Sequence, residues 1–255
     1  MTDKLTAALL VIGNEILSGR TQDTNTPWIA GKLNLRGIRL IEVRVVPDVE
    51  ECIVEAVNEL RSRAAYLFTT GGIGPTHDDI TTESIAKAFG VGAIVNEEAR
   101  LALLNHYRNE ADLTPARMKM AHIPDGATLI PNPVSGAPGF QIGNVYVMAG
   151  VPRIMQAMLD HILPELEKGH PILSNTVTCD LPESVVAEGL TAIQNKYDSV
   201  EIGSYPHFRM GELGLSVVLR STENNQLHEA TQDVVSLIDK VGGKAFAVSV
   251  QSNPS

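Results

Sequence analysis

The residues of this sequence best suited to chemistry lie in one glycine-rich segment, at positions 68–83. An apolar run, Tyr66–Phe68, leads through two threonines into three glycines within four residues, Gly71, Gly72 and Gly74. Because glycine lacks a Cβ, the backbone N–H groups of such a loop can approach a phosphate closely. A helix start follows the loop and adds further N–H donors with a partial positive charge. The segment therefore predicts an anion-binding site between a strand and a helix.

Two acidic residues complete this segment. Pro75 and Thr76 belong to the same predicted phosphate loop, and Asp78 and Asp79 follow them. Carboxylates next to a phosphate would repel it unless a cation lies between them, so the pair predicts Mg²⁺ or another divalent metal. Alternatively, the acids only stabilise the start of the next helix, and the glycines only form a turn. The segment matches neither the dinucleotide-binding fingerprint nor the P-loop.

Composition limits the functions that this chain can have. The 255 residues carry a net charge of −10, which argues against binding of nucleic acid through a broad basic face. Cys52 and Cys179 lie far apart and form no zinc or disulfide pattern. No apolar run reaches the length of a membrane span, and residues 1–4 do not begin a signal peptide. We therefore expect a reduced, cytoplasmic protein with no membrane partner.

The elements that must position the glycine-rich segment alternate regularly. Hydrophobic periodicity predicts strands at 6–12, 38–46, 66–70, 127–130 and 144–148, and helices at 50–63, 82–89, 97–109 and 152–166. A further helix is expected to follow a cap at 23–25 and to continue until Gly37. This alternation predicts an α/β fold, with a mostly parallel sheet covered by helices on both faces. Residues 131–143 are expected to form a loop, and we assign no structure to 110–123.

A second, smaller pattern follows a linker at 169–171. We predict strands at 175–180, 200–205, 214–221 and 245–250, and helices at 182–197 and 227–241. The predicted domains are therefore an α/β domain at 1–169 and a small α+β module at 172–250.

Polar residues follow the ends of three predicted strands. Gly13 and Glu15 follow the first, Asp48 follows the second, and the glycine-rich segment follows the third. Because ligands bind at the carboxyl ends of parallel strands, these residues are expected to lie along one edge of the sheet.

These motifs resemble the molybdopterin-binding (MoCF-biosynthesis) superfamily, and within it the branch named CinA, for competence/damage-inducible protein A. The resemblance covers about 150 residues, and its matching segments are 12–20, 23–25, 47–48, 69–83, 124–127, 137–140 and 150–152, with 203–206 matching the middle module of the branch. It implies a three-layer sandwich, a homo-oligomer and a phosphate-containing ligand. The amidohydrolase domain of full-length CinA proteins is not expected here.

The resemblance also implies roles for individual residues. Asp79 and Asp48 are the expected catalytic residues, and with Glu15 they are the expected ligands of Mg²⁺ or another divalent metal. Asp78 is expected only to shape the turn. The expected phosphate- or nucleotide-binding residues are Gly13, Ser18, Gly71, Gly72, Gly74, Pro75, Thr76, Ser135, Gly136 and Pro138. The sequence departs from the family at Asn14, where an Asp is usual, and at Ser135, where the hydroxyl is shifted by one residue.

Three functions remain open from the sequence. The first is a metal-dependent nucleotide pyrophosphatase, acting on ADP-ribose, FAD or a related dinucleotide diphosphate, because the CinA branch is associated with such substrates. The second is a molybdopterin-binding protein or molybdopterin adenylyltransferase, whose ligand is a pterin phosphate. The third is a domain that binds without catalysis. Further candidates for phosphate contact are His77, Arg117, Lys119 and His122, each of which is equally compatible with a solvated side chain.

Overall fold

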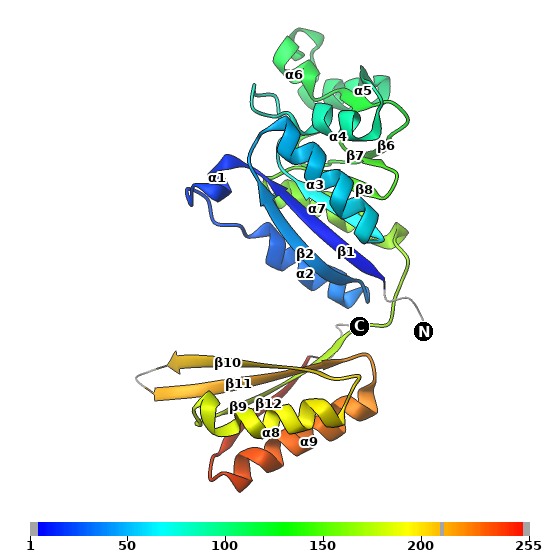
Figure 1. Cartoon of the computed structure of the whole chain (residues 1–255). Coiled ribbons are helices and arrows are strands. Elements are labelled where there is room, and N and C mark those ends of the chain that lie inside the picture. Colours follow the sequence, from blue (N-terminus) through cyan, green and yellow to red (C-terminus); the bar gives the residue numbers. More distant parts are fainter. Residues whose placement is uncertain (1–4, 210–211, 252–255) are drawn as a thin grey trace. The chain divides into compact units, whose positions relative to one another are not determined.

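The computed structural model describes residues 5–209 and 212–251 of the chain. The chain divides into two compact units, Met1–Gly169 and His170–Ser255 (Figure 1). Within the described residues, no helix has the length and apolar character needed to cross a bilayer.

The first unit is built on a six-stranded sheet in the order β2-β1-β3-β8-β7-β6. These strands are β1 (Thr6–Ile12), β2 (Arg39–Val46), β3 (Tyr66–Thr70), β6 (Thr128–Ile130), β7 (Gly139–Ile142) and β8 (Val145–Met148). The pairs among β2, β1, β3 and β8 are parallel, whereas β7 runs antiparallel to both of its neighbours. This mostly parallel α/β sheet confirms the predicted fold class.

Side chains of β1 alternate between the two faces of the sheet and so explain why both are covered. Leu9 packs on one face with α2 (Asn25–Leu35) and α7 (Pro152–Ile162). Leu10 packs on the other with α3 (Glu50–Arg63), α4 (Thr81–Phe89) and α5 (Glu97–Tyr107). A central strand that is buried on both sides needs the continuous apolar run that the sequence provides. The result is a three-layer sandwich (Figure 1).

Several short elements escaped prediction. The prediction of a loop at 131–143 was wrong for residues 139–142, which form β7 and pair with β6 and β8. The segment after β1 forms a one-turn helix, α1 (Asn14–Leu17). Between α5 and β6, the chain forms α6 (Pro115–Lys119) and β5 (His122–Pro124), which pairs with β4 (Ala93–Val95). Two short 3₁₀ turns, η1 (Glu110–Asp112) and η2 (Leu163–Glu165), complete the unit.

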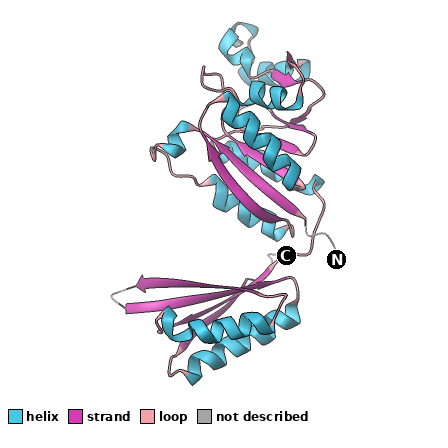
Figure 2. Ribbon diagram, viewed as in Figure 1, coloured by secondary structure: helices cyan, strands magenta, loops and turns pink. Residues whose placement is uncertain are grey.

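The second unit packs two helices on one face of an antiparallel sheet (Figure 2). The strand order is β10-β11-β9-β12, with β9 (Leu173–Cys179), β10 (Glu201–Arg209), β11 (Glu212–Ser221) and β12 (Ala245–Gln251). The helices are α8 (Glu183–Lys196) and α9 (Asn224–Lys240). This is the small α+β architecture that the sequence predicts for this region.

Candidate functional site

The predicted site residues of β1 and β2 lie together at the carboxyl edge of the sheet. Gly13 N–H donates to the Val46 carbonyl at 3.1 Å, and Asn14 N–H donates to Asp48 Oδ2 at 2.9 Å. Asp48 therefore binds the first turn of α1, where a carboxylate stabilises the helix N-terminus. The Glu15 carboxylate folds back over Gly13, where a Cβ would lie 2.5 Å from Oε2. These contacts give Asp48 and Gly13 a structural role at this edge.

Gly71 joins this edge to the central strands. Its N–H donates to the Met148 carbonyl at the end of β8, at 3.1 Å. A Cβ on Gly71, whose φ is +104°, would lie 2.1 Å from the carbonyl oxygen of Ile12 at the end of β1. A Cβ on Gly150 would in turn lie 3.2 Å from the Cα of Gly71. The ends of β1, β3 and β8 thus meet at a point that only glycine fits.

The loop beyond Gly71 contains backbone donors without a partner among the described residues. Thr81 satisfies two loop carbonyls, because its N–H donates to Gly72 O at 2.9 Å and its Oγ1 donates to Gly71 O at 3.0 Å. In contrast, the N–H groups at 72–74 have no hydrogen-bond partner among the described residues. Consecutive free N–H groups in a glycine loop form a concave anion-binding surface. The geometry therefore fits the phosphate site that the sequence predicts at Gly72 and Gly74.

Asp79 is built into this loop. Its Oδ2 accepts hydrogen bonds from the Thr76 N–H at 2.8 Å and from the Thr76 hydroxyl. Gly74 leaves room for the carboxylate, since a Cβ there would lie 2.6 Å from Oδ2. Asp79, the expected catalytic residue, thus makes hydrogen bonds within the turn that Asp78 was expected to shape. The Thr76 side chain, and more weakly His77 and Lys119, hold the pKa of exposed Asp78 below its usual range.

The predicted metal ligands do not converge in this structure. Asp48 follows β2 and Asp79 follows β3, and β1 lies between these strands, so the strand axes are about 10 Å apart. Among the described residues, no three His, Cys, Asp or Glu side chains are grouped so that they could hold a metal. Mg²⁺ nevertheless needs only one or two carboxylates when substrate phosphates and water supply the remaining ligands. Asp79, whose Oδ1 has no described partner, fits that role.

The further cationic candidates have different surroundings. His77 is 98% exposed, which matches the solvated alternative. An Arg117 nitrogen donates to the Asp112 carbonyl at 2.7 Å, and the guanidinium lies 4.0 Å from the centre of the Tyr107 ring. In contrast, Lys119 Nζ donates to the Thr76 carbonyl at 2.9 Å, so Lys119 lies directly at the glycine-rich loop. His122 is half-buried in β5.

The predicted loop at Ser135, Gly136 and Pro138 joins β6 to β7. Since β7 runs antiparallel to β8, this loop lies at the same edge of the sheet as Gly150. Asn132, which the sequence analysis missed, organises the loop: its Oδ1 accepts from the N–H groups of residues 134 and 135, and its Nδ2 donates to Ser135 Oγ at 2.6 Å. No hydrogen bond of the described residues joins this loop to the glycine-rich loop.

Ser18 and Asn25, which also follow β1, differ in burial and in the contacts that they make. Ser18, predicted to bind phosphate, is exposed after α1, and its hydroxyl donates to the Glu15 carbonyl at 3.3 Å. Asn25, which was not among the predicted site residues, is buried and donates from Nδ2 to the Gly150 carbonyl at 2.8 Å. Its Oδ1 has no described partner. The asparagine in the matching segment 23–25 was the signal that could have pointed to this contact.

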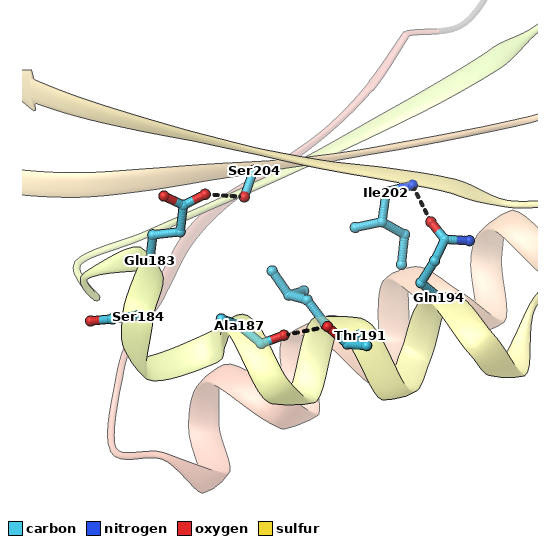
Figure 3. A pocket seen from close by; sticks show the side chains of 8 residues that line it. Glu183, Ser184, Ala187, Thr191, Gln194, Ile202 and Ser204 are labelled. Atoms are coloured by element: carbon cyan, nitrogen blue, oxygen red, sulfur yellow. Dashed lines mark hydrogen bonds between the residues drawn. The ribbon is translucent and has the colours of Figure 1, made fainter.

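A pocket of about 530 Å³ lies in the second unit, between α8 and the edge strand β10 (Figure 3). Gln194 binds this strand edge, because its Oε1 accepts from Ile202 N–H at 2.8 Å and its Nε2 donates to the Val200 carbonyl at 2.6 Å. Glu183 accepts a hydrogen bond from the Ser204 hydroxyl. The lining residues include no Lys, Arg or His, so the pocket lacks the cations that a phosphate ligand favours.

Two family models match this chain, and the boundary between them lies close to the boundary between the two units of the fold. The family model described as "Probable molybdopterin binding domain" matches residues 8–168. A second model, "FAD synthase, middle domain", matches residues 171–242.

Individual relatives cover large parts of the chain. A protein of Pyrobaculum aerophilum is 40% identical over 210 residues, which are 78% of this chain and 79% of that protein. A CinA-like protein of Thermosipho melanesiensis is 34% identical over 247 residues, covering 94% of this chain and 60% of that longer protein. The solved structure of the protein CinA, of unknown function, from Thermoplasma acidophilum has a TM-score of 0.60 and 36% identity, covering 63% of this chain and 96% of that one.

Proposed function

Because this chain belongs to the molybdopterin-binding-domain family and is of the CinA N-terminal type, we propose that it is a metal-dependent nucleotide pyrophosphatase. The proposed substrates are dinucleotide diphosphates such as FAD and ADP-ribose. The observation that carries the proposal is the row of unpaired N–H groups at 72–74 with the Asp79 carboxylate packed on Gly74. This arrangement provides an anion-binding surface and a metal ligand side by side.

The substrate class follows from two further features. The match of residues 171–242 to a middle domain of FAD synthase points to a flavin–adenine dinucleotide, whose two halves are joined by a diphosphate. The edge that carries the site runs along six strands and is about 24 Å long, and the glycine-rich loop lies between the loops after β1 and β2 and those next to β8 and β7. An extended ligand can therefore place its diphosphate at the centre and its ring systems toward Asn25 or the Ser135 loop.

In the proposed reaction, water adds to one phosphorus, the bond from that phosphorus to the bridging oxygen breaks, and two phosphomonoesters leave. The N–H groups at 72–74 hold the non-bridging oxygens, where negative charge increases in the transition state. Asp79 would hold the metal, and Thr76 fixes the Asp79 carboxylate through two hydrogen bonds. Bound Mg²⁺ would neutralise charge on the phosphates and lower the pKa of a coordinated water.

Turnover measurements test this proposal. The full chain is incubated with FAD, ADP-ribose or NAD⁺ in the presence of Mg²⁺, Mn²⁺ or Co²⁺, and the two monophosphate products are quantified. Asp79→Ala should reduce turnover by at least about 10- to 100-fold, since loss of even an outer-shell partner of a metal ligand typically costs that much. Undiminished hydrolysis by Asp79→Ala would remove Asp79 from the mechanism.

The family description supports a second candidate, a molybdopterin-binding protein or molybdopterin adenylyltransferase. A pterin phosphate presents the same phosphate to the loop at 72–74, but it has no diphosphate bond to hydrolyse. Tight binding of molybdopterin, with no hydrolysis of any dinucleotide under the same metals, would favour this candidate. ATP-dependent transfer of an adenylyl group to molybdopterin would identify the transferase.

A further inference from the structure

Lys119 brings a positive charge to the glycine-rich loop from a distant part of the chain. Its Nζ donates to the Thr76 carbonyl at 2.9 Å, although 43 residues separate the two positions. Lys119 ends α6, a short helix that begins at Pro115 and is capped by the Thr114 hydroxyl, which accepts from the Arg117 N–H at 3.4 Å. The cap and the proline fix the start of this short helix. The half-buried lysine is therefore held at the loop by a helix whose start is fixed and whose Met118 packs against the core.

The ammonium group of Lys119 retains binding capacity. It carries three N–H donors, and the Thr76 carbonyl accepts one of them, so two donors have no partner among the described residues. Arg117, two residues earlier on the same helix, is in the opposite situation. Its guanidinium donates to the Asp112 carbonyl and stacks on the Tyr107 ring. Within α6, Lys119 is thus the cation that is available to a ligand, and Arg117 is the matched control.

The position of Lys119 relative to the free N–H groups decides which ligand it fits. Thr76 is two residues beyond Gly74, so their Cα atoms are at most about 8 Å apart. The free N–H groups at 72–74 can hold one phosphate, and a flexible lysine side chain at Thr76 can reach a second phosphate attached to the first. The neighbouring carboxylates of Asp78 and Asp79 disfavour an anion that lacks such a cationic partner.

We propose that Lys119 binds the second phosphate of a diphosphate whose first phosphate lies on the N–H groups of residues 72–74. This inference deepens the proposed function, because it makes the loop selective for diphosphates over monophosphates. It concerns binding alone, so it can be tested with a diphosphate analogue that is not hydrolysed.

The test is isothermal titration calorimetry on the full chain with methylenediphosphonate and with inorganic phosphate, each with and without Mg²⁺. The wild-type protein should bind the diphosphonate more tightly than phosphate. Lys119→Gln should weaken diphosphonate binding by about 10- to 100-fold, the range for loss of a hydrogen bond to a charged group, and change phosphate affinity by less than about threefold. Lys119→Arg should restore much of the loss, since it keeps the charge. Arg117→Gln should leave the preference unchanged.

Three results would overturn the proposal. The first is that the wild-type protein binds both probes with equal affinity or binds neither. The second is that Lys119→Gln weakens the binding of both probes equally. The third is that Arg117→Gln loses the preference for the diphosphonate as much as Lys119→Gln does. The urea midpoint of each variant shows whether the fold is retained. Because methylenediphosphonate has no bond for the enzyme to cleave, a chain without hydrolytic activity can still satisfy this test. Failure of the proposed reaction and failure of the Lys119 assignment are therefore distinguishable.

Discussion

Substitution of Gly72 by alanine tests whether contact with Thr81 fixes the glycine-rich loop. Gly72 has φ +67°, and a Cβ there would lie 2.1 Å from Thr81 Oγ1. Gly90, in the same unit, has nearly the same φ of +70°, but a Cβ there would have nothing within 4 Å. Both variants carry the cost of a left-handed alanine, about 1–2 kcal/mol. Only Gly72→Ala adds the clash, so the difference between them isolates the contact.

The magnitude of the clash follows from the surroundings of Thr81. This side chain is fully buried, and its hydroxyl donates to the Gly71 carbonyl at 3.0 Å. Displacing it costs about 1–3 kcal/mol of overpacking and about 1 kcal/mol for the lost hydrogen bond. Gly72→Ala should therefore lower the free energy of unfolding by about 2–4 kcal/mol more than Gly90→Ala does. At a typical urea slope, this difference lowers the unfolding midpoint by about 1–2 M.

The assay uses the single tryptophan of the chain, Trp28, which lies in α2 and packs against the core of the first unit. Its fluorescence during urea unfolding reports the first unit, which avoids treating a two-unit chain as one transition. The double variant Gly72→Ala/Thr81→Ala removes the hydroxyl that the new Cβ meets. It should be less destabilised than the sum of its single variants, by about 1–3 kcal/mol. Equal free energies for Gly72→Ala and Gly90→Ala would refute the assigned contact.

Three further predictions concern other parts of the chain. Asp48→Ala should destabilise the first unit by about 1 kcal/mol in urea unfolding, because the hydrogen bond from Asn14 N–H is lost. Asp48→Asn keeps an acceptor for this N–H, so its stability should be unchanged and a change in its turnover would show a catalytic role of the carboxylate. Asn132→Ala should raise amide hydrogen exchange at 133–137 and cost about 1–3 kcal/mol, because two backbone N–H groups lose their acceptor. The hydrogen bond from Lys196 lowers the pKa of Asp233 in the folded protein. The second unit should therefore lose stability as the pH falls below the usual Asp pKa of about 4 and through the lower pKa of the folded state. Asp233→Asn should make this loss smaller in an acid titration, measured by hydrogen exchange of α9.

Elements with long hydrophobic patterns could be predicted from the sequence, and short ones could not. The predicted bounds at 6–12, 50–63 and 66–70 agree with β1, α3 and β3, because their apolar residues recur over several turns or pleats. The strand β7 has only four residues and begins with Gly139, so its sequence resembles a loop. Its extended conformation depends on pairing with β6 and β8, which is a tertiary effect. The three-residue strands β4 and β5 were missed for the same reason.

The candidate site shows the same division between local and tertiary information. Glycines at 71, 72 and 74 could be recognised because positive φ and close approach leave a local signature. Lys119 was only one of four further candidates for phosphate contact, and its hydrogen bond to Thr76 could not be predicted because the two residues lie 43 positions apart and α6 is only five residues long. Asn132 likewise acts on backbone groups that any sequence of residues 134 and 135 would present.

The way in which this edge is built bears on how its ligand is selected. Gly71 meets the ends of β1 and β8 through backbone atoms, and the donors at 72–74 are also backbone groups, so none of these contacts depends on a side chain. A main-chain cradle can hold a phosphate but cannot distinguish one phosphorylated ligand from another. Selectivity must then come from side chains next to this cradle, and Asp79 and Lys119, which both bond Thr76 of the same loop, are the described side chains in that position.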